Sequence, residues 1–167
     1  MHMADLTGLM AYARSRTGEL LEAVAATGRA DEALRWRPGP GRANLGWQFM
    51  HLAATDHRFE TLRLQGIPAT DTALAGGYGF GSTPNDAPPN LAEIRATLDR
   101  TRAALLKFLA TLPEASIDQF PPAPPAGGPV PPARTFREWL TMLAWHEGHH
   151  HGQAQLTLNL WKAAHPQ

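Results

Sequence analysis

Histidine is concentrated in one short stretch of this 167-residue chain. Four of the eight histidines and one glutamate fall within six consecutive residues, inside the sequence WHEGHHHGQ at 145–153. Imidazole is a common protein ligand of zinc and similar divalent cations, and two histidines four positions apart on a helix share one face. His146 and His150 have this spacing. The stretch therefore predicts a metal site, and the alternatives are a solvated histidine run or an expression tag.

The histidine stretch lies inside a longer amphipathic pattern. Apolar residues continue beyond it at Leu156, Leu158, Leu160 and Trp161. A tag would lie at a terminus without such a flanking pattern. We therefore interpret the stretch as a site on a helix.

A helical wheel at about 100° per residue separates these side chains by direction. His150 lies about 20° from the centre of the apolar face, and His146 about 60° from it. Glu147 lies about 40° away on the other side, His149 about 120° away, and His151 at an ambiguous angle of about 80°. We expect His146, Glu147 and His150 to point inward and His149 to be solvated.

Composition limits the possible ligands and partners. The chain has no cysteine, which excludes a disulfide framework, a thiolate metal site and a cysteine nucleophile. Basic and acidic residues number 15 each without a run of either sign, so neither nucleic acid nor an anionic membrane is indicated as a partner. No apolar run approaches the ~20 residues that span a bilayer, and the N-terminus lacks a signal layout. We expect a cytoplasmic protein that acts on a small molecule.

Four amphipathic segments must position the histidines. The periodicity predicts helices over residues 5–27, 45–66, 91–112 and 136–163, with an N-cap at Asn44 and capping boxes that begin at Asn90 and Thr135. Residues 70–89 and 113–134 are rich in glycine or proline and are expected to be loops that close over a site. No segment alternates with a period of two. We expect an all-α four-helix bundle, one domain over residues 4–167, with residues 1–3 as a cloning remnant.

The same residues match the short HExxH motif of zinc peptidases, through His146, Glu147 and His150. The longer metzincin form fails, because Gln153 and Leu156 stand where it requires glycine and histidine. No acidic residue follows Glu147, so a third ligand must come from elsewhere, most simply from another helix. His51 is the best candidate. Periodicity places it at the flank of its apolar stripe and, taken alone, favours a packed core or helix-interface histidine.

The chain resembles the DinB/YfiT-like superfamily in two segments. The resemblance rests on LRWRP at 34–38, LGW at 45–47 and HLA at 51–53, together with His146, His150 and GQ at 152–153. It implies a four-helix bundle that binds one divalent metal through one histidine of the second helix and two of the last. On this chain the implied ligands are His51, His146 and His150, and a homodimer is also implied.

Three neutral histidines leave coordination positions open, which is typical of a catalytic metal site. The resemblance implies either transfer of a low-molecular-weight thiol to an electrophile or hydrolysis of a small ester or amide. The expected metal is zinc or nickel, with iron and manganese as alternatives. Glu147 is a candidate general base or ligand-orienting group, and its alternative is an ordinary pairing role on the helix. A non-catalytic stress-response or binding bundle with a vestigial site is the remaining alternative.

Overall fold

The computed structural model describes residues 2–124 and 132–166, and every regular element in them is a helix. The four long helices are α1 (Met3–Ala25), α3 (Leu45–Arg58), α5 (Leu91–Leu109) and α6 (Phe136–Ala164). Shorter elements are α2 (Ala30–Arg35), α4 (Thr72–Tyr78), a π-helix η1 (Phe59–Gln65) that continues α3, and a 3-10 turn η2 (Glu114–Ser116). The all-α bundle predicted from the sequence is confirmed.

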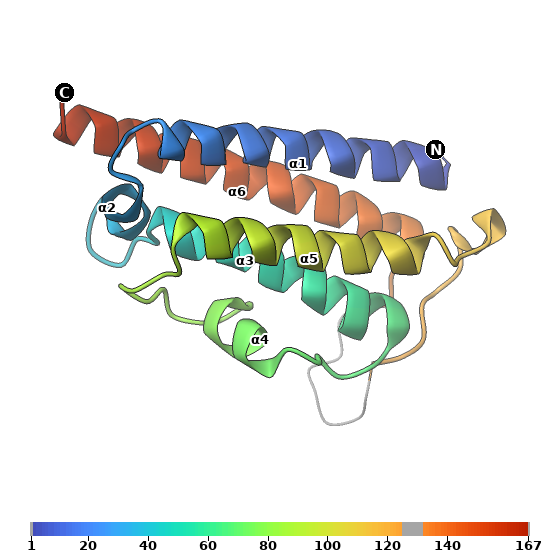
Figure 1. The fold of residues 1–167 in the computed structure, drawn as a ribbon. Coiled ribbons are helices and arrows are strands. Elements are labelled where there is room, and N and C mark those ends of the chain that lie inside the picture. The colour runs from blue at the N-terminus through green and yellow to red at the C-terminus, as the bar shows by residue number, and fades with distance from the viewer. Residues whose placement is uncertain (1, 125–131, 167) are drawn as a thin grey trace.

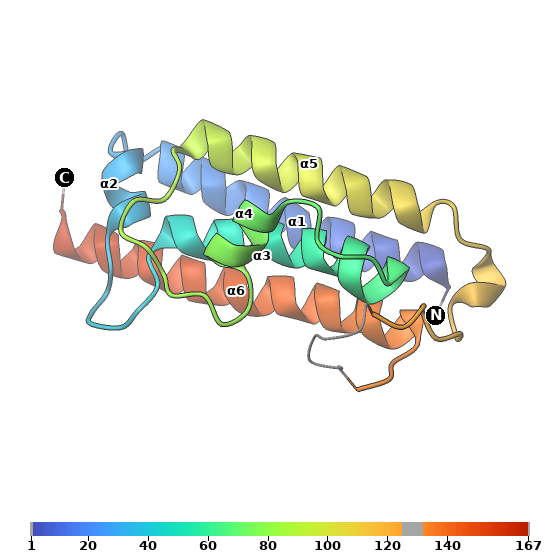
Figure 2. The same ribbon diagram turned by 90° about the horizontal axis from the view of Figure 1, so that it is seen from below.

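The long helices form two pairs. α1 and α6 lie side by side and run in one direction, whereas α3 and α5 run in the opposite direction (Figures 1 and 2). α6 also packs against α3, and this contact brings the histidine-rich helix beside the helix that carries His51.

The helices begin at the capping residues that the sequence predicts. The Asn44 side chain accepts a hydrogen bond from the Trp47 amide at 2.8 Å. Asn90 and Thr135 each form a complete capping box with the glutamate three residues later. These caps satisfy amide groups that the first helical turn leaves without partners. They fix where α3 and α6, the two histidine-bearing helices, begin.

The second predicted helix ends at Gly66, as expected, but its last seven residues are π-helical. Gly66 adopts φ 66°, a left-handed conformation that glycine reaches without steric cost. A Cβ at this position would lie 2.7 Å from the Ala123 carbonyl oxygen. Glycine therefore permits both the turn and the close passage of the proline-rich segment.

Two apolar clusters fill the bundle, and a polar layer lies between them. One cluster includes Leu20, Ala54, Leu98 and Ala154, and the other includes Met10, Phe59, Leu105 and Ala144. Each long helix carries one charged residue between the two clusters. Asp56, Arg102 and Glu147 are buried, and Arg14 is half-buried. The candidate histidines His51, His146 and His150 lie at the same level of the bundle.

The prediction of a continuous loop over residues 70–89 is wrong, because this segment contains α4. Asp71 caps α4 by accepting a hydrogen bond from the Leu74 amide at 3.0 Å, and the Leu74 side chain is buried. The pattern is too short and too rich in glycine to show a helical period, so packing against α3 determines this helix. The six-residue α2 was not predicted either, because it is too short to show a helical period.

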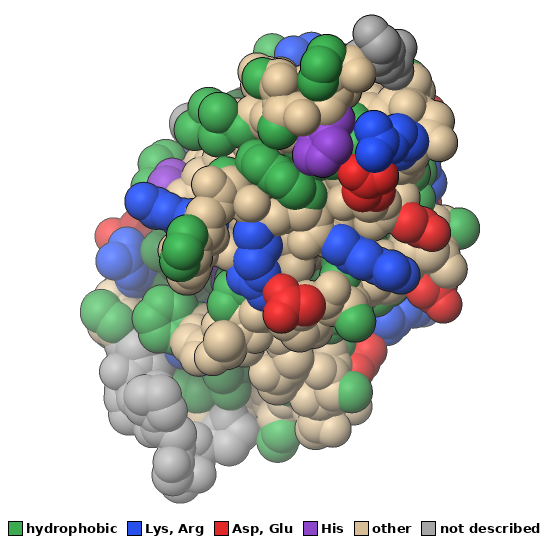
Figure 3. Space-filling view, turned by 90° about the vertical axis from the view of Figure 1, so that its left-hand side faces the viewer, with side chains coloured by type: hydrophobic (Ala, Val, Ile, Leu, Met, Phe, Trp, Pro, Cys, Tyr) green, Lys and Arg blue, Asp and Glu red, His purple; other side chains and the backbone are tan. Residues whose placement is uncertain are grey.

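The second predicted loop, over residues 113–134, falls partly outside the described residues. Its described part begins with η2 and returns to α6, where the Phe136 amide donates to the Gln119 carbonyl at 3.0 Å. Among the described helices, none has the length and apolar character needed to cross a membrane. At the end of the molecule that carries α2, basic and acidic side chains are interspersed (Figure 3).

Candidate metal centre

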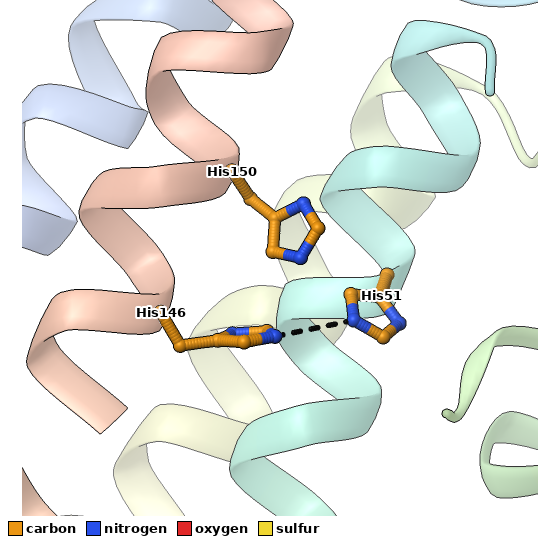
Figure 4. Close-up of side chains that lie close together, drawn as sticks. All are labelled: His51, His146 and His150. Carbon is orange, nitrogen blue, oxygen red and sulfur yellow. Dashed lines mark hydrogen bonds between the residues drawn. The ribbon is translucent and has the colours of Figure 1, made fainter. Parts of the chain in front are cut away.

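His51, His146 and His150 come together between α3 and α6. One ring nitrogen of each lies within 4.8 Å of the others, so the three can hold one metal ion. The three imidazoles point toward one another across the gap between the two helices (Figure 4). The sequence places His146 and His150 on one helical face, and the α3–α6 contact adds His51 from 95 residues away.

The spacing of the rings fits a small cation. The Nε2 atoms of His51 and His146 are 3.3 Å apart, and the His146 and His150 ring centroids are 4.5 Å apart. Two nitrogen ligands of a tetrahedral zinc ion, each about 2.05 Å from the metal, lie about 3.3 Å apart. The spacing of His51 and His146 therefore suits two ligands of zinc or a cation of similar size, and the His150 nitrogen lies within 4.8 Å of both.

The orientation of His51 is fixed from two sides. Its Nδ1–H donates to the carbonyl of Tyr78, the last residue of α4, at 2.6 Å. The Trp47 ring stacks on the imidazole, with centroids 4.8 Å apart and planes inclined by 11°. Because Nδ1 carries the proton, the lone pair is on Nε2, which faces His146. A backbone carbonyl thus selects the tautomer that a metal ligand needs.

A second histidine of α3 holds the other end of α4. Nε2 of His57 accepts a hydrogen bond from the Asp71 amide at 3.0 Å, just before α4 begins. His51 and His57 therefore attach α4 to α3 at both ends. No sequence pattern indicates this role, since α4 was not predicted and both histidines lie on one amphipathic helix.

The histidine rings are held in the neutral form. Burial lowers the pKa of His51, and burial with the neighbouring histidines lowers the pKa of His146 to about 4 and of His150 to about 3. Neutral imidazole is the form that binds a metal. Among the described residues, Nδ1 of His146 and Nδ1 of His150 have no hydrogen-bond partner, in contrast to Nδ1 of His51.

The other two histidines of the run lie outside the cluster. His149 is exposed, as the helical wheel predicts, and stacks on Trp145 with centroids 5.3 Å apart. His151 is half-buried, and burial and the nearby Arg16 lower its pKa. Neither belongs to the group whose nitrogens converge.

Glu147 is buried, with 2% of its surface exposed, and it faces a cluster of charges. Its carboxylate accepts hydrogen bonds from Nε of Arg14 at 2.6 Å, from the Thr17 hydroxyl at 3.1 Å and from Arg102. Asp56 completes the cluster through a two-pronged contact with Arg102 at 2.9 and 3.2 Å and through Arg14 at 2.9 Å. Burial raises the pKa of Asp56, and the two guanidinium groups oppose that rise.

This arrangement bears on the expected role of Glu147. Both carboxylate oxygens are engaged by groups of α1 and α5, away from the converging imidazole nitrogens. In the HExxH peptidase arrangement the glutamate must reach a water at the metal. In this structure the side chain contributes to the contact between helices, and its role as a base or ligand-orienting group stays a prediction.

A pocket opens beside the histidines. Its volume is about 390 Å³, and His51 and His146 form part of its wall. Aromatic and basic side chains supply most of the remainder: Arg58, Phe59, Arg63, Phe80, Arg134, Trp139 and Trp145. No aspartate or glutamate lines the pocket in the parts of the chain that the structure describes. The histidine cluster thus has an open side that a small molecule can reach.

The sequence was compared with known families and proteins. A family model described as DinB superfamily matches residues 9–154, a span that includes all three converging histidines. A search of curated proteins found no match.

Proposed function

The chain belongs to the DinB superfamily, and we propose that it is a metal-dependent enzyme that transfers a low-molecular-weight thiol to an electrophilic small molecule. His51, His146 and His150 would hold one divalent cation, zinc or nickel. The position of the pocket next to two of these residues supports a catalytic site over a purely structural one.

One observation carries the choice of thiol transfer over hydrolysis. The described lining of the pocket contains no carboxylate, and Glu147 is engaged by Arg14 and Arg102. A hydrolase gains from a general base that takes a proton from water during attack. A thiol has a far lower pKa than water and needs less help from a base. The absence of cysteine is consistent with a thiol supplied from outside the chain.

A bound divalent cation lowers the pKa of a thiol that reaches it, so that the nucleophilic thiolate is available at neutral pH. The residues of this chain would do the rest. The Tyr78 carbonyl keeps His51 in the required tautomer, and the aromatic walls of the pocket exclude water from the electrophile. In the addition, the S–H bond breaks and sulfur forms a bond to the electrophilic carbon. The π bond or strained C–O bond of the electrophile breaks at the same carbon, and the atom that keeps its electron pair takes up the proton.

The proposal is tested by turnover. Glutathione, mycothiol and bacillithiol are each supplied with a model electrophile to metal-loaded protein, metal-stripped protein and the His150→Ala variant. Thiol addition should be fastest with loaded protein and fall to the uncatalysed rate in the other two. Equal rates in all three, together with metal-dependent ester or amide hydrolysis by the loaded protein, would replace the transferase with a hydrolase. If no preparation turns over either class of substrate, a non-catalytic binding bundle is left.

A further inference from the structure

Three arginines line the pocket beside the histidine cluster. Arg58 lies at the end of α3, Arg63 lies on η1, and Arg134 lies just before α6. All three are half-buried, and within the described residues none forms an ion pair with a carboxylate. By contrast, Arg14 and Arg102, which do not line the pocket, are paired with Asp56 and Glu147.

The Arg63 guanidinium contains a buried nitrogen, Nη1, without a hydrogen-bond partner among the described groups. A buried donor without a partner costs about 1–3 kcal/mol, and more when it is charged. Burial and the neighbouring Arg58 both lower the pKa of Arg63, in keeping with positive charges that lack a counterion. An anion in the adjoining pocket, which Arg63 lines, would balance the charge of this guanidinium.

Trp139 organises two of the cations. The Cζ atoms of Arg63 and Arg134 lie 5.4 and 5.5 Å from the centre of the Trp139 ring. Phe59 meets the same ring edge-on, with centroids 5.6 Å apart. Stacking on an aromatic face holds a guanidinium in place while its N–H groups stay free to bind a ligand. The geometry therefore presents donors to the pocket in a fixed arrangement.

Most of the rest of the wall is apolar. Phe59, Phe80, Met142 and Trp145 join Trp139 around a volume of about 390 Å³. Pockets for organic ligands are about 300–1,000 Å³ and combine mostly apolar walls with a few polar groups that fix orientation. An inorganic anion alone would leave this apolar surface unused. The ligand that fits has an anionic end and an apolar body.

We propose that this pocket binds a small organic carboxylate with an apolar body, and that Arg58, Arg63 and Arg134 pair with its carboxylate. Guanidinium groups match the planar carboxylate with two parallel hydrogen bonds. Binding of the carboxylate does not depend on the proposed thiol transfer. The identification of this ligand as the electrophilic substrate does rest on it. The carboxylate would anchor the substrate at one end, while the reactive carbon lies toward His51 and His146, which share the same pocket wall.

The test measures binding without catalysis. Metal-stripped protein is titrated with 4-phenylbutyrate, with its uncharged amide and with inorganic phosphate, by calorimetry and by tryptophan fluorescence. The carboxylate should bind at least tenfold more tightly than the amide or phosphate, and its affinity should fall with added salt. Arg63→Gln and Arg134→Gln should each weaken carboxylate binding at least tenfold. Arg63→Lys, which keeps the charge without the planar fork, should lie between wild type and Arg63→Gln.

Arg35→Gln is the matched control, because Arg35 is exposed on α2 at the opposite end of the bundle (Figure 1). It should leave binding unchanged. Equal affinity for carboxylate and amide would overturn the proposal, and so would normal carboxylate binding by both folded Gln variants. If phosphate binds as tightly as the carboxylate, the ligand does not need an apolar body, and that part of the proposal is wrong. Carboxylate binding by a protein that fails the turnover test would refute thiol transfer alone, and turnover without carboxylate binding would refute this inference alone.

Discussion

The Glu147 carboxylate accepts a hydrogen bond from Nε of Arg14 at 2.6 Å, and this contact ties the middle of α6 to α1. Glu147 lies between His146 and His150 in sequence, so its anchorage also sets their rotation and height in the bundle. Asp56 does the same for α3, five residues beyond His51, through its contacts with Arg14 and Arg102. One charge from each long helix thus aligns the helices that carry the candidate ligands.

Replacing Glu147 should reveal a structural role. Glu147→Gln removes one of two negative charges that face two arginines, and breaking a buried ion pair costs about 3–5 kcal/mol. We expect a free energy of unfolding that is lower by about 3 kcal/mol, measured in urea. The metal should still bind to the folded variant, because the ligands themselves remain.

Glu19→Gln is the control for this experiment. Glu19 pairs with Arg16 on the surface of α1, where an ion pair contributes little. Its unfolding curve should overlay that of the wild type. A Glu147→Gln variant that is equally stable but catalytically inactive would restore Glu147 as a general base.

The attachment of α4 should influence metal affinity from outside the ligand set. Asp71→Ala removes the cap of α4 and loosens the helix whose last carbonyl holds His51. Loss of a group that orients a ligand typically lowers metal affinity 10–100-fold. We expect the dissociation constant for the metal to be about tenfold larger, measured by competition titration with a chelator. Asn90→Ala, which removes the cap of α5, should leave metal affinity unchanged, and an equal effect of both caps would contradict a specific role for α4.

The metal-free protein should lose stability in mild acid. The pKa values of His146 and His150 are lowered from 6.5 to about 4 and about 3 in the folded state. The unfolded chain therefore binds more protons than the folded chain below pH 6.5, and stability falls as the pH drops from there toward 4. Thermal unfolding in chelator should show a midpoint that falls from pH 6.5 to 5. His146→Gln/His150→Gln should flatten this dependence, and an unchanged slope would show that these rings do not cause it.

The protein should not cleave casein or peptide libraries. The HExxH match lacks a downstream ligand, and the Glu147 carboxylate is occupied by arginines of two other helices. Chelator-sensitive proteolysis by the pure protein would contradict this and favour the zinc peptidase alternative.

The sequence predicted those features that depend on local patterns. Asn44, Asn90 and Thr135 marked helix starts correctly, because a cap needs only its own first turn. The direction of His149 was also correct, since it follows from helical period alone. These features belong to single elements.

Two features that depend on packing between elements escaped prediction. The wheel placed Glu147 inward, yet its partners Arg14 and Arg102 lie on helices whose rotation no sequence pattern reveals. α4 was assigned to a loop, although its Tyr78 carbonyl orients His51. Only the tertiary contacts show these roles.

The central claim is that His51, His146 and His150 bind one divalent ion. It is tested most directly by elemental analysis of protein purified without a nickel column, compared across single alanine variants at these three positions and at His149. We expect about one equivalent of metal in the wild type and in His149→Ala, and a sharp loss in each of the other three variants. Full occupancy in His51→Ala combined with loss in His149→Ala would contradict it.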